Sequence, residues 1–384
     1  MSFKSIKKML EIRILRVFMT VLHIFSIKQN RIILNSYTGT QYSCNPKYIT
    51  EAILKRFPDK YEIIWTFKEP DKFQFLEEKG IKVVKYASIK RFYYEATAKV
   101  SINNIGSYSW QPIRKGQQHV NTWHSALDLN NCALMESAND KIMKKTIFMN
   151  AKETSLFLSA NRFFTEFCIP KEFGYNGKIL EYGLPRNDDY INGNAEKIKK
   201  EVRKKLNIAE DAVVVMYAPT WRYGKAKDAP KIDLELLNRA MQKRFGQNYL
   251  ILFRAHHFAG NISVEKLEHV KNMTEYPSIQ ELVMATNILI TDYSSVMWDA
   301  ALMGEYVLLF APDLEKYSKE RGLYIPINEW CFPVSLNNKD LAAEIEKVDL
   351  EKGIEMAKKH LEKFGNLETG RAAEEFCNWL EAIE

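Results

Sequence analysis

The sequence of 384 residues predicts an α/β protein made of two Rossmann-like domains that face each other across a cleft. Short apolar runs alternate with helix-like stretches in two successive series. The turn-rich segment Tyr182–Asn194 separates the series, and the charged stretch Ala195–Leu206 opens the second one. We therefore expect an N-terminal helix over residues 1–28, a first domain over residues 29–190 and a second domain over residues 191–384.

The first series contains apolar runs that are typical of buried strands. Helix-like stretches lie between them, among them Pro46–Phe57 and Ile89–Ala98. Strands that alternate with helices predict a parallel sheet with helices on both faces. The predicted strands are Arg31–Tyr37, Tyr61–Phe67, Ile81–Tyr86, Val100–Asn104, His119–Trp123, Leu156–Ser159 and Ile179–Tyr182.

The second series repeats this alternation, and the chain after Asn337 is predicted to be helical to its end. In parallel α/β sheets, ligands bind at the carboxyl ends of the strands. The polar motifs that follow the strands are therefore the candidates for a functional site. The predicted strands of this half are Ala212–Ala218, Tyr249–Arg254, Ile288–Thr291 and Tyr306–Phe310.

The composition, 46% hydrophobic and 27% charged, is that of a globular protein rather than a disordered or multi-spanning one. A net charge of +7 favours an anionic partner, such as a phosphate-rich substrate or an acidic lipid. No recognisable nucleic-acid module accompanies this charge, so we expect no nucleic-acid partner. The five cysteines are scattered, with no C-x-x-C pair, which predicts reduced thiols and a cytoplasmic location.

A basic and apolar segment opens the chain. Lysines and arginines at positions 4, 7, 8, 13 and 16 are interleaved with large apolar residues up to Phe25. The uncharged run after Arg16 is shorter than the ~20 residues that a spanning helix needs. We expect an amphipathic helix on the anionic cytoplasmic face of the cell membrane, which would make the protein peripheral. The alternative is a helix packed on the protein's own core.

The segment Ile288–Leu302 is the most informative in the chain. It begins as a buried strand that ends at Thr291–Tyr293, and Ser294 and Ser295 stand where a helix begins. Serine is a preferred N-cap residue, and a helix N-terminus offers free N–H groups to phosphate oxygens. The alternative is an ordinary joint between a strand and a helix.

Two further motifs follow predicted strands. In Asn121–Asp128, His124 stands where a histidine can take a proton from an acceptor hydroxyl near neutral pH, although a structural histidine is the commoner case. In Tyr217–Arg222, a proline stops the strand and is followed by Thr220 and Arg222. Arg222 can form a bidentate bond with a phosphate, and the alternative is a turn with a surface arginine.

Positive charge also gathers at Arg254, His256 and His257, at the end of another predicted strand. Buried cations need carboxylates or a bound phosphate. Strand alternation puts His256 on the same face as Arg254. A metal site has little support, because no third ligand stands at a recognisable spacing. We expect no cofactor and no resident metal, and dependence on a divalent ion stays open.

Together these motifs resemble the CDP-glycerol glycerophosphotransferase family, which includes teichoic-acid primases and polymerases and their relatives in capsule synthesis. The resemblance runs from about Arg31 to the C-terminus. It implies a glycosyltransferase-B-like fold, a CDP-activated polyol phosphate as donor and a membrane-associated enzyme. The matching segments are Asn35-Ser-Tyr, Ser43-Cys-Asn-Pro, Thr122-Trp-His, Glu181–Asp188, Tyr217–Arg222, Thr291–Ser295, Ala311–Tyr317 and Arg321-Gly.

The resemblance also implies roles for single residues. His124 corresponds to the catalytic base, and His256 corresponds to a second essential histidine near the donor phosphates. An acceptor hydroxyl, on the first-domain side, attacks the phosphorus that bears glycerol, and CMP leaves from the second-domain side. The acceptor would be a lipid-linked or polymeric glycan of the cell envelope. The residues predicted to bind the donor, by resemblance or by position, are Thr220, Arg222, Arg254, Asp292, Ser294, Ser295 and Arg321.

Some positions depart from the family pattern. Trp123–Leu129 keeps the histidine but lacks the glycine, threonine, proline and lysine usual there, which puts the usual polyol-phosphate acceptor in doubt. Ile327–Pro333 lacks a glycine–proline turn, and Thr369 stands where an aspartate is common. Two other classes stay open: a glycosyltransferase that uses a nucleotide sugar, and a non-catalytic membrane-bound assembly factor. Glycerol and ribitol are also not distinguished.

Overall fold

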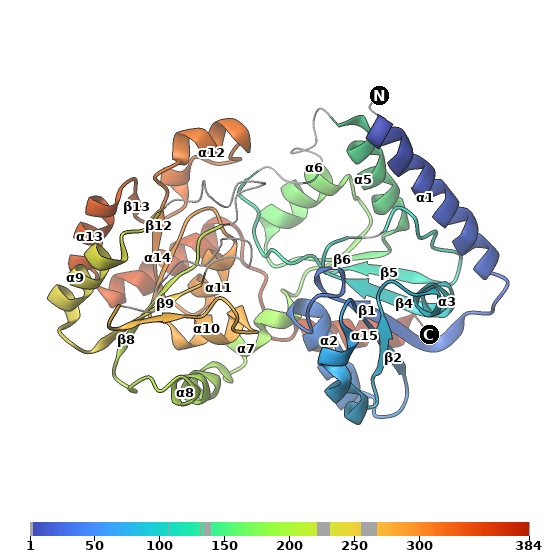
Figure 1. The fold of residues 1–384 in the computed structure, drawn as a ribbon, viewed down its shortest axis with the longest axis horizontal. Coiled ribbons are helices and arrows are strands. Elements are labelled where there is room, and N and C mark those ends of the chain that lie inside the picture. Colours follow the sequence, from blue (N-terminus) through green and yellow to red (C-terminus); the bar gives the residue numbers. More distant parts are fainter. Residues whose placement is uncertain are drawn as a thin grey trace. The chain divides into compact units, whose positions relative to one another are not determined.

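The structure, a computed structural model, describes residues 3–106, 108–130, 133, 140–220, 231–254 and 267–383. The chain divides into two compact units (Figure 1). The first unit comprises residues 1–126, 132–188 and 367–384, and the second comprises residues 127–131 and 189–366. Each unit contains one parallel sheet, so the predicted α/β fold with two Rossmann-like parts is confirmed.

The sheet of the first unit has the strand order β3-β2-β1-β4-β5-β6-β7, and all its pairs are parallel. The order reverses between β1 and β4, which is where doubly wound sheets bind their ligands. The central strands are apolar and buried, as strands covered by helices on both faces must be. The strands are β1 (Lys28–Asn35), β2 (Glu62–Phe67), β3 (Lys82–Lys85), β4 (Ala98–Asn103), β5 (Gln118–Asn121), β6 (Leu156–Leu158) and β7 (Lys178–Leu180).

Helices and short helical turns connect these strands. The α-helices are α1 (Phe3–Leu22), α2 (Cys44–Arg56), α3 (Ile89–Thr97), α5 (Lys141–Glu153), α6 (Ile169–Phe173) and α15 (Ala372–Ala382), and α7 (Asp188–Ile191) follows where the chain leaves the unit. The shorter turns are η1 (Tyr37–Gly39), η2 (Pro70–Lys79), η3 (Phe164–Cys168) and η4 (Pro185–Asn187).

The sheet of the second unit has the order β10-β9-β8-β11-β12-β13 and is also parallel throughout. Its order reverses between β8 and β11. Two edge strands, of three and two residues, were not predicted, because each contains a single apolar residue and so forms no apolar run. The strands are β8 (Val213–Tyr217), β9 (Tyr249–Phe253), β10 (Val270–Asn272), β11 (Ile288–Thr291), β12 (Tyr306–Phe310) and β13 (Val334–Ser335).

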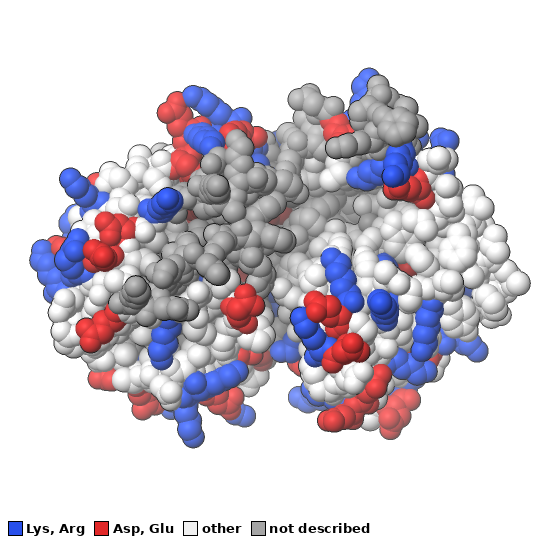
Figure 2. Space-filling model, in the orientation of Figure 1, with Lys and Arg blue, Asp and Glu red and all other residues white. Residues whose placement is uncertain are grey.

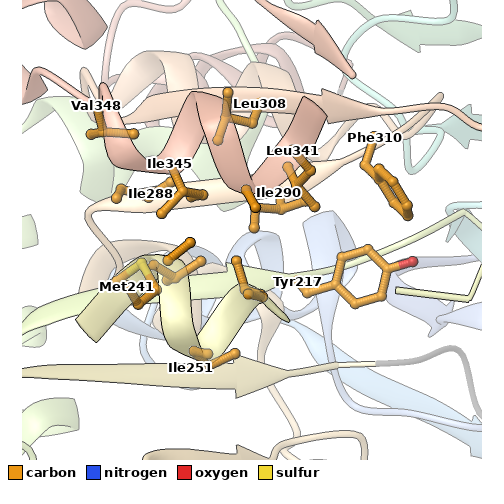
Figure 3. Close-up of a cluster of buried hydrophobic side chains, with 14 of the residues drawn as sticks. Tyr217, Met241, Ile251, Ile288, Ile290, Leu308, Phe310, Leu341, Ile345 and Val348 are labelled. Carbon is orange, nitrogen blue, oxygen red and sulfur yellow. The ribbon is translucent and has the colours of Figure 1, made fainter. Parts of the chain in front are cut away.

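One face of this second sheet packs against α9 and α13 (Figure 3). Ile290 and Leu308 from the sheet meet Met241 of α9 and Ile345 of α13 in one buried apolar cluster. The helices of the unit are α8 (Ala195–Lys205), α9 (Leu234–Phe245), α10 (Ile279–Ala285), α11 (Val296–Leu302), α12 (Leu314–Glu320), α13 (Asn338–Glu346) and α14 (Leu350–Lys363), with the turn η6 (Ile327–Glu329).

The two units differ from the predicted domains in two segments. Residues 127–131 belong to the second unit, and residues 367–384 belong to the first. We expected the helical tail to stay with the second domain, whereas α15 packs beside α2, where Arg56 donates to Asn378 at 2.6 Å. The helical pattern of the tail is visible in the sequence, but the partner that buries its apolar face is not.

Helix α1 has two apolar faces. Met9, Ile12 and Met19 are buried against the first unit, where Met9 and Ile12 pack on Ile142 of α5. Arg16 forms an ion pair of 2.7 Å with Glu153 of α5. This buried face agrees with the alternative prediction, in which the N-terminal helix packs on the protein's own core.

The opposite side of α1 is uncovered in the described structure. Leu10, Ile14, Val17 and Val21 are 56–66% exposed, and their spacing forms one stripe along a helix. Ile24 continues the stripe at 78% exposed just after α1 ends. The margin that the C-terminal half of α1 occupies in Figure 1 carries few charged side chains in Figure 2. No helix in the described part of the chain is both long and apolar enough to cross a membrane.

Candidate active site

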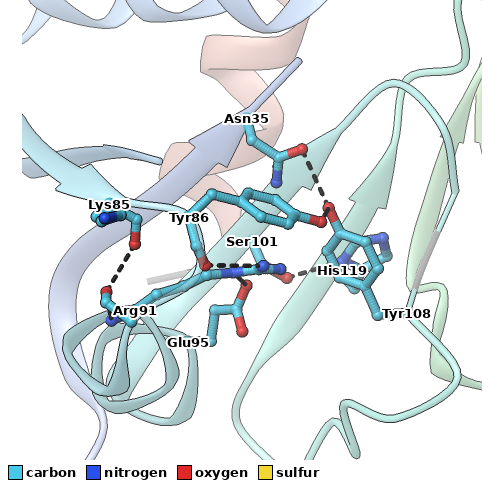
Figure 4. Close-up of polar contacts among 9 residues, drawn as sticks. Asn35, Lys85, Tyr86, Arg91, Glu95, Ser101, Tyr108 and His119 are labelled. Atoms are coloured by element: carbon cyan, nitrogen blue, oxygen red, sulfur yellow. Dashed lines mark hydrogen bonds and ion pairs between the residues drawn. The ribbon is translucent and has the colours of Figure 1, made fainter. Parts of the chain in front are cut away.

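Asparagines end three neighbouring strands of the first sheet. Asn35, Asn103 and Asn121 lie side by side in register across β1, β4 and β5, and all three are buried. The side chain of Asn35 accepts a hydrogen bond of 3.1 Å from the hydroxyl of Tyr108 (Figure 4). These amides form a polar edge at the point where the strand order reverses.

Buried polar contacts connect this edge to α3. Tyr86 donates to the hydroxyl of Tyr108 at 3.1 Å, and the guanidinium of Arg91 lies 3.7 Å from the ring centre of Tyr86 (Figure 4). Arg91 is paired with Glu95 at 2.8 Å, and both side chains are buried. A buried pair of this kind is costly to break, so it fixes the position of the loop that carries Tyr86.

His124 lies three residues beyond the end of β5, at the same polar edge. Its Nδ1 lies 2.8 Å from the backbone carbonyl oxygen of Asn104. A carbonyl oxygen only accepts hydrogen bonds, so Nδ1 carries a proton, and in the neutral ring Nε2 is then the basic nitrogen. The ring is half-buried, with the ring of Tyr37 centred 5.8 Å away. When the ring is neutral, the geometry therefore selects the Nδ1–H tautomer of His124.

The backbone around His124 is strained. Trp123 has a φ of 47°, and Tyr37 and Thr38 in the loop after β1 have φ of 46° and 55°. Bulky and β-branched residues rarely adopt this left-handed conformation, which costs about 1–3 kcal/mol per residue. Such strain persists only where the surroundings enforce it, and it is often found at functional sites. Three of these residues gather at one sheet edge here.

A second histidine of the same strand has a different environment. His119 is fully buried in β5, and its Nδ1 lies 2.8 Å from the hydroxyl of Ser101. Burial lowers the pKa of His119 to about 3, so it stays neutral over the physiological range. His119 is therefore a structural residue, whereas His124 is the partly accessible one.

In the second unit, Thr220 and Asp292 come together where the strand order reverses. Oδ1 of Asp292 accepts hydrogen bonds from the backbone N–H of Thr220 at 2.8 Å and from its hydroxyl. The same oxygen accepts from the backbone N–H of Tyr293 at 2.7 Å. Asp292 is almost completely buried. This carboxylate fixes the loops after β8 and β11 to each other.

Ser294 and Ser295 precede α11, as predicted. The hydroxyl oxygen of Ser294 accepts from the backbone N–H of Val296 at 3.3 Å, so Ser294 supplies the cap. Ser295 occupies the N-cap position, but its side chain makes no capping hydrogen bond. Both serines are half-buried. α11 has only seven residues, so its helix dipole is small. Any contact with an anion at this end would therefore depend mainly on the two hydroxyls.

Arg254 follows β9 at the same edge of the second sheet. Its backbone N–H donates to the carbonyl of Tyr217, the last residue of β8, at 2.9 Å. Its guanidinium donates to the carbonyls of Met273 at 3.1 Å and Tyr276 at 2.7 Å. We expected carboxylates or a phosphate as the partners of this guanidinium. The structure shows backbone carbonyls instead, which accept its hydrogen bonds but do not neutralise its charge.

Arg321 lies at the C-terminal end of α12. Its backbone N–H donates to the carbonyl of Tyr317, one turn earlier, at 2.8 Å. The ring of Tyr317 stacks on that of Tyr293 with centres 3.7 Å apart, and Asn130 donates to its hydroxyl at 2.5 Å. α12 is therefore docked on the loop that contains Asp292 and the two serines.

The structure thus places Thr220, Arg254, Asp292 and the two serines at the carboxyl edge of the second sheet and Arg321 at the end of α12, whereas His124 belongs to the first unit. Two predicted residues, Arg222 and His256, lie outside the described residues, as does the neighbouring His257. Among the residues that the structure describes, no group of three or more His, Cys, Asp and Glu side chains could hold a metal ion.

Sequence reasoning missed Asn104, Tyr293 and Tyr317. A signal existed for the first of these, because asparagines stand at or near the carboxyl ends of three predicted strands. The stacking of Tyr293 on Tyr317 had no comparable signal, since it depends on how α12 folds back on the sheet.

Two parallel sheets with polar loops where the strand order reverses define a doubly wound α/β protein with two Rossmann-like units. Residues 17–382 match the CDP-Glycerol:Poly(glycerophosphate) glycerophosphotransferase family. The chain belongs to this family, which confirms the resemblance seen in the sequence.

Three relatives define the similarity. The chain is 31% identical over 367 residues to a teichoic acid poly(glycerol phosphate) polymerase of Bacillus subtilis (strain 168), which covers 92% of this chain and 48% of the polymerase. It is 28% identical over 407 residues to a teichoic acid glycerol-phosphate transferase of Staphylococcus aureus (strain NCTC 8325 / PS 47), with 98% of each chain covered. A solved structure of a variant of the wall teichoic acid polymerase TagF, soaked with CDPG, matches with a TM-score of 0.83 and 26% identity. That match covers 100% of this chain and 98% of the other.

This chain spans about half the length of the Bacillus subtilis polymerase, since the alignment covers 48% of that protein.

Proposed function

We propose that the protein transfers glycerol phosphate, or a similar polyol phosphate, from its CDP-activated form to a hydroxyl of a teichoic-acid-type or capsule-type acceptor, with release of CMP. The observation that carries this proposal is the fixed tautomer of His124, in a chain that belongs to a glycerophosphotransferase family. The relatives named as a polymerase and a transferase of glycerol phosphate, and the TagF structure soaked with CDPG, support the choice of donor.

The acceptor half of the reaction is assigned to His124. Its Nε2 takes the proton of the acceptor hydroxyl while the hydroxyl oxygen forms a bond to the phosphorus that bears glycerol. The bond between that phosphorus and the bridging oxygen breaks, and CMP leaves with the bonding electrons. Phosphoryl transfer asks little covalent chemistry of the protein, so the positions of the groups and their charges supply most of the rate.

The donor half is assigned to the second unit. Arg254 and Arg321 supply positive charge, and the hydroxyls of Ser294 and Ser295 donate to phosphate oxygens. We assign Asp292 to loop support, because its negative charge would repel a phosphate, and Thr220 with it, because its backbone N–H and its hydroxyl both donate to Asp292. Arg222 and His256, outside the described residues, complete the donor site in this proposal through the family resemblance alone.

We also propose that the protein is attached to the cytoplasmic face of the membrane through α1. The exposed stripe from Leu10 to Ile24 offers apolar side chains to the acyl region. Lys7 and Arg13 are exposed, and with about 3.6 residues per turn they fall on either side of this stripe. Cations beside an apolar stripe suit the anionic headgroups of a leaflet. A lipid-linked acceptor would be presented at the same surface.

The test of the reaction is CMP release from CDP-glycerol and CDP-ribitol, with UDP-sugars as controls and membrane extract as the source of acceptor. Acceptor-dependent CMP release with one polyol donor, lost in His124→Ala, is the expected result. UDP release from a sugar with no response to either polyol would assign the protein to the glycosyltransferases instead.

A non-catalytic assembly factor is distinguished by the same variant. Unchanged polymer synthesis in cells that carry only His124→Ala would contradict the enzymatic proposal. Calorimetric titration with CDP-glycerol separates a missing acceptor from a dead site, because an intact donor site binds whether or not an acceptor is present.

A further inference from the structure

Asn45, in the first turn of α2, contacts the turn that carries His124. Its side chain is completely buried. Its Nδ2 lies 3.2 Å from the carbonyl oxygen of Thr122 and 3.1 Å from that of Trp123, and it donates to both. Its Oδ1 accepts from the backbone N–H of Arg186 at 3.2 Å. One amide therefore satisfies three backbone groups from two distant segments of the first unit.

The two carbonyls that Asn45 binds belong to the strained part of this turn. Trp123, with its φ of 47°, has its N–H bonded to the side chain of Asn121 at 2.9 Å. Its carbonyl accepts from Asn45 and from the hydroxyl of Thr122 at 3.1 Å. A bulky residue keeps a left-handed conformation only if its surroundings hold it there. The bonds on either side of Trp123 provide that hold.

The direction of the His124 ring depends on this conformation. His124 is the next residue after Trp123, so a flip of Trp123 to the ordinary φ region would turn the peptide that leads into His124. The contact of Nδ1 with the carbonyl of Asn104, which fixes the tautomer, would then be lost. Nε2 would no longer be held as the basic nitrogen.

We propose that Asn45 is a positioning residue for His124: it stabilises the left-handed turn at Trp123 and thereby keeps Nδ1 of His124 on the carbonyl of Asn104, with Nε2 as the basic nitrogen of the neutral ring. This inference rests on the proposed role of His124 as the base. Asn45 touches neither substrate in this proposal. Its influence on turnover passes through the backbone of residues 122–124.

The test compares Asn45→Ala and Asn45→Asp with a matched control. Asn45→Asp keeps an oxygen that can accept from Arg186 and removes the amide donor, so it remains informative if Asn45→Ala fails to fold. Gln117→Ala is the control, because Gln117 is a buried amide that donates to the carbonyls of Glu95, Ala96 and Ala98 at the opposite end of β5.

With CDP-glycerol and membrane extract, both Asn45 variants are expected to lose about tenfold to 100-fold in kcat, the effect of a misplaced catalytic group. Their affinity for CDP-glycerol should match that of the wild type, and Gln117→Ala should keep its kcat. In a His124→Ala background, Asn45→Ala should cause no further loss, since residues that act through one another are not additive. An unchanged kcat in both Asn45 variants, or an equal further loss without His124, would overturn the inference.

A spectroscopic measurement keeps this test independent of the proposed reaction. In protein labelled with 15N-histidine, the His124 signals are assigned by their absence in His124→Ala, and the wild type should show the Nδ1–H tautomer. Asn45→Asp should show a mixture of tautomers, and Gln117→Ala should not. An unaltered His124 tautomer in Asn45→Asp would refute the positioning role even if the donor proved to be something other than CDP-glycerol.

Discussion

The side-chain amide of Asn187 donates a hydrogen bond of 2.6 Å to the carboxylate of Glu368, although 181 residues separate the two in the chain. The other oxygen of Glu368 accepts from the backbone N–H of Leu184 at 2.9 Å. Asp188 accepts from the backbone N–H of Ala372 at 2.9 Å and so caps α15. The chain leaves the first unit after Asp188 and returns at residue 367, and these bonds fasten both passages to that unit.

Gly183→Ala is expected to weaken this attachment. Gly183 has a φ of 95°, and a Cβ atom there would lie 2.1 Å from Oε2 of Glu368. The substitution combines backbone strain of about 1–2 kcal/mol with a steric clash of about 1–3 kcal/mol. For units of this size, each kcal/mol lowers the midpoint of thermal unfolding by about 2–4 °C.

Gly80→Ala is the matched control for that prediction. Gly80 has a similar φ of 75°, but nothing lies within 4 Å of the added Cβ atom. The loss of stability in Gly80→Ala should therefore come from backbone strain alone, without a steric clash. Calorimetry that finds the same midpoint for both variants would mean that the contact between Gly183 and Glu368 contributes nothing.

The sequence predicted those parts of the fold that depend on local pattern. β11 and β12 were placed to the residue, because each is a continuous apolar run that is buried on both faces. His124, Ser294 and Ser295 were singled out because they follow strands, which is a general rule of parallel sheets. The sequence did not distinguish the two serines as caps: the hydroxyl of Ser294 makes the capping bond, whereas Ser295 occupies the N-cap position without one.

Features that depend on distant partners were not predictable in this way. Asn45 bonds to carbonyls 77 and 78 residues away, and its own neighbours in the sequence indicate only the start of a helix. Tryptophan rarely adopts a positive φ, so the local preference of Trp123 predicts a negative φ, whereas the observed φ is 47°. Tertiary contacts specify the conformation of these residues, and the strands only bring them to the carboxyl edge of each sheet.

Stability should fall in acid partly because of His119. Its folded-state pKa of about 3 lies below the ordinary value of 6.5, so between these limits the unfolded chain binds a proton that the folded one does not. Above about pH 6.5 both states are neutral and there is no effect. Below it, the free energy of unfolding should fall by about 1.4 kcal/mol per pH unit for this residue, levelling off near pH 3.

The measurement is urea unfolding of the wild type and His119→Gln between about pH 7 and pH 5. Glutamine can still bond to Ser101 but does not titrate in this range. The free energy of unfolding should change less steeply with pH in the variant, because unfolding of the variant takes up about one proton fewer in this range. Identical slopes would mean that His119 is solvated and titrates normally in the folded protein.

Replacement of apolar residues in the exposed stripe of α1 should abolish membrane binding. Val17→Glu combined with Val21→Glu changes two side chains that are 66% and 62% exposed, so the fold should be kept. Each buried valine contributes about 1.5–3 kcal/mol to insertion, so the affinity for phosphatidylglycerol vesicles should fall at least about 100-fold. Sedimentation with vesicles measures this directly, and neutral vesicles report how much of the binding depends on the positive charge of the protein.

Ile354→Glu is the control for the stripe, because Ile354 is 61% exposed on α14 of the second unit. It should bind vesicles as the wild type does. Equal binding by the α1 variant and the wild type would exclude α1 as the attachment site, and equal loss in Ile354→Glu would attribute the effect to added negative charge in general.

Ser295→Ala should weaken the binding of CDP-glycerol. The hydroxyl of Ser295 makes no capping hydrogen bond to α11, so it is available to a phosphate oxygen, and such a bond to a charged group contributes about 1.5–3 kcal/mol. The dissociation constant should rise about tenfold to 100-fold. Ser278→Ala is the matched control, because Ser278 caps α10 by accepting from the N–H of Glu281 at 3.2 Å and lies outside the proposed donor site. Titration calorimetry that finds equal donor affinity in the wild type and Ser295→Ala would contradict the phosphate contact, whereas equal weakening in both variants would assign the effect to helix stability.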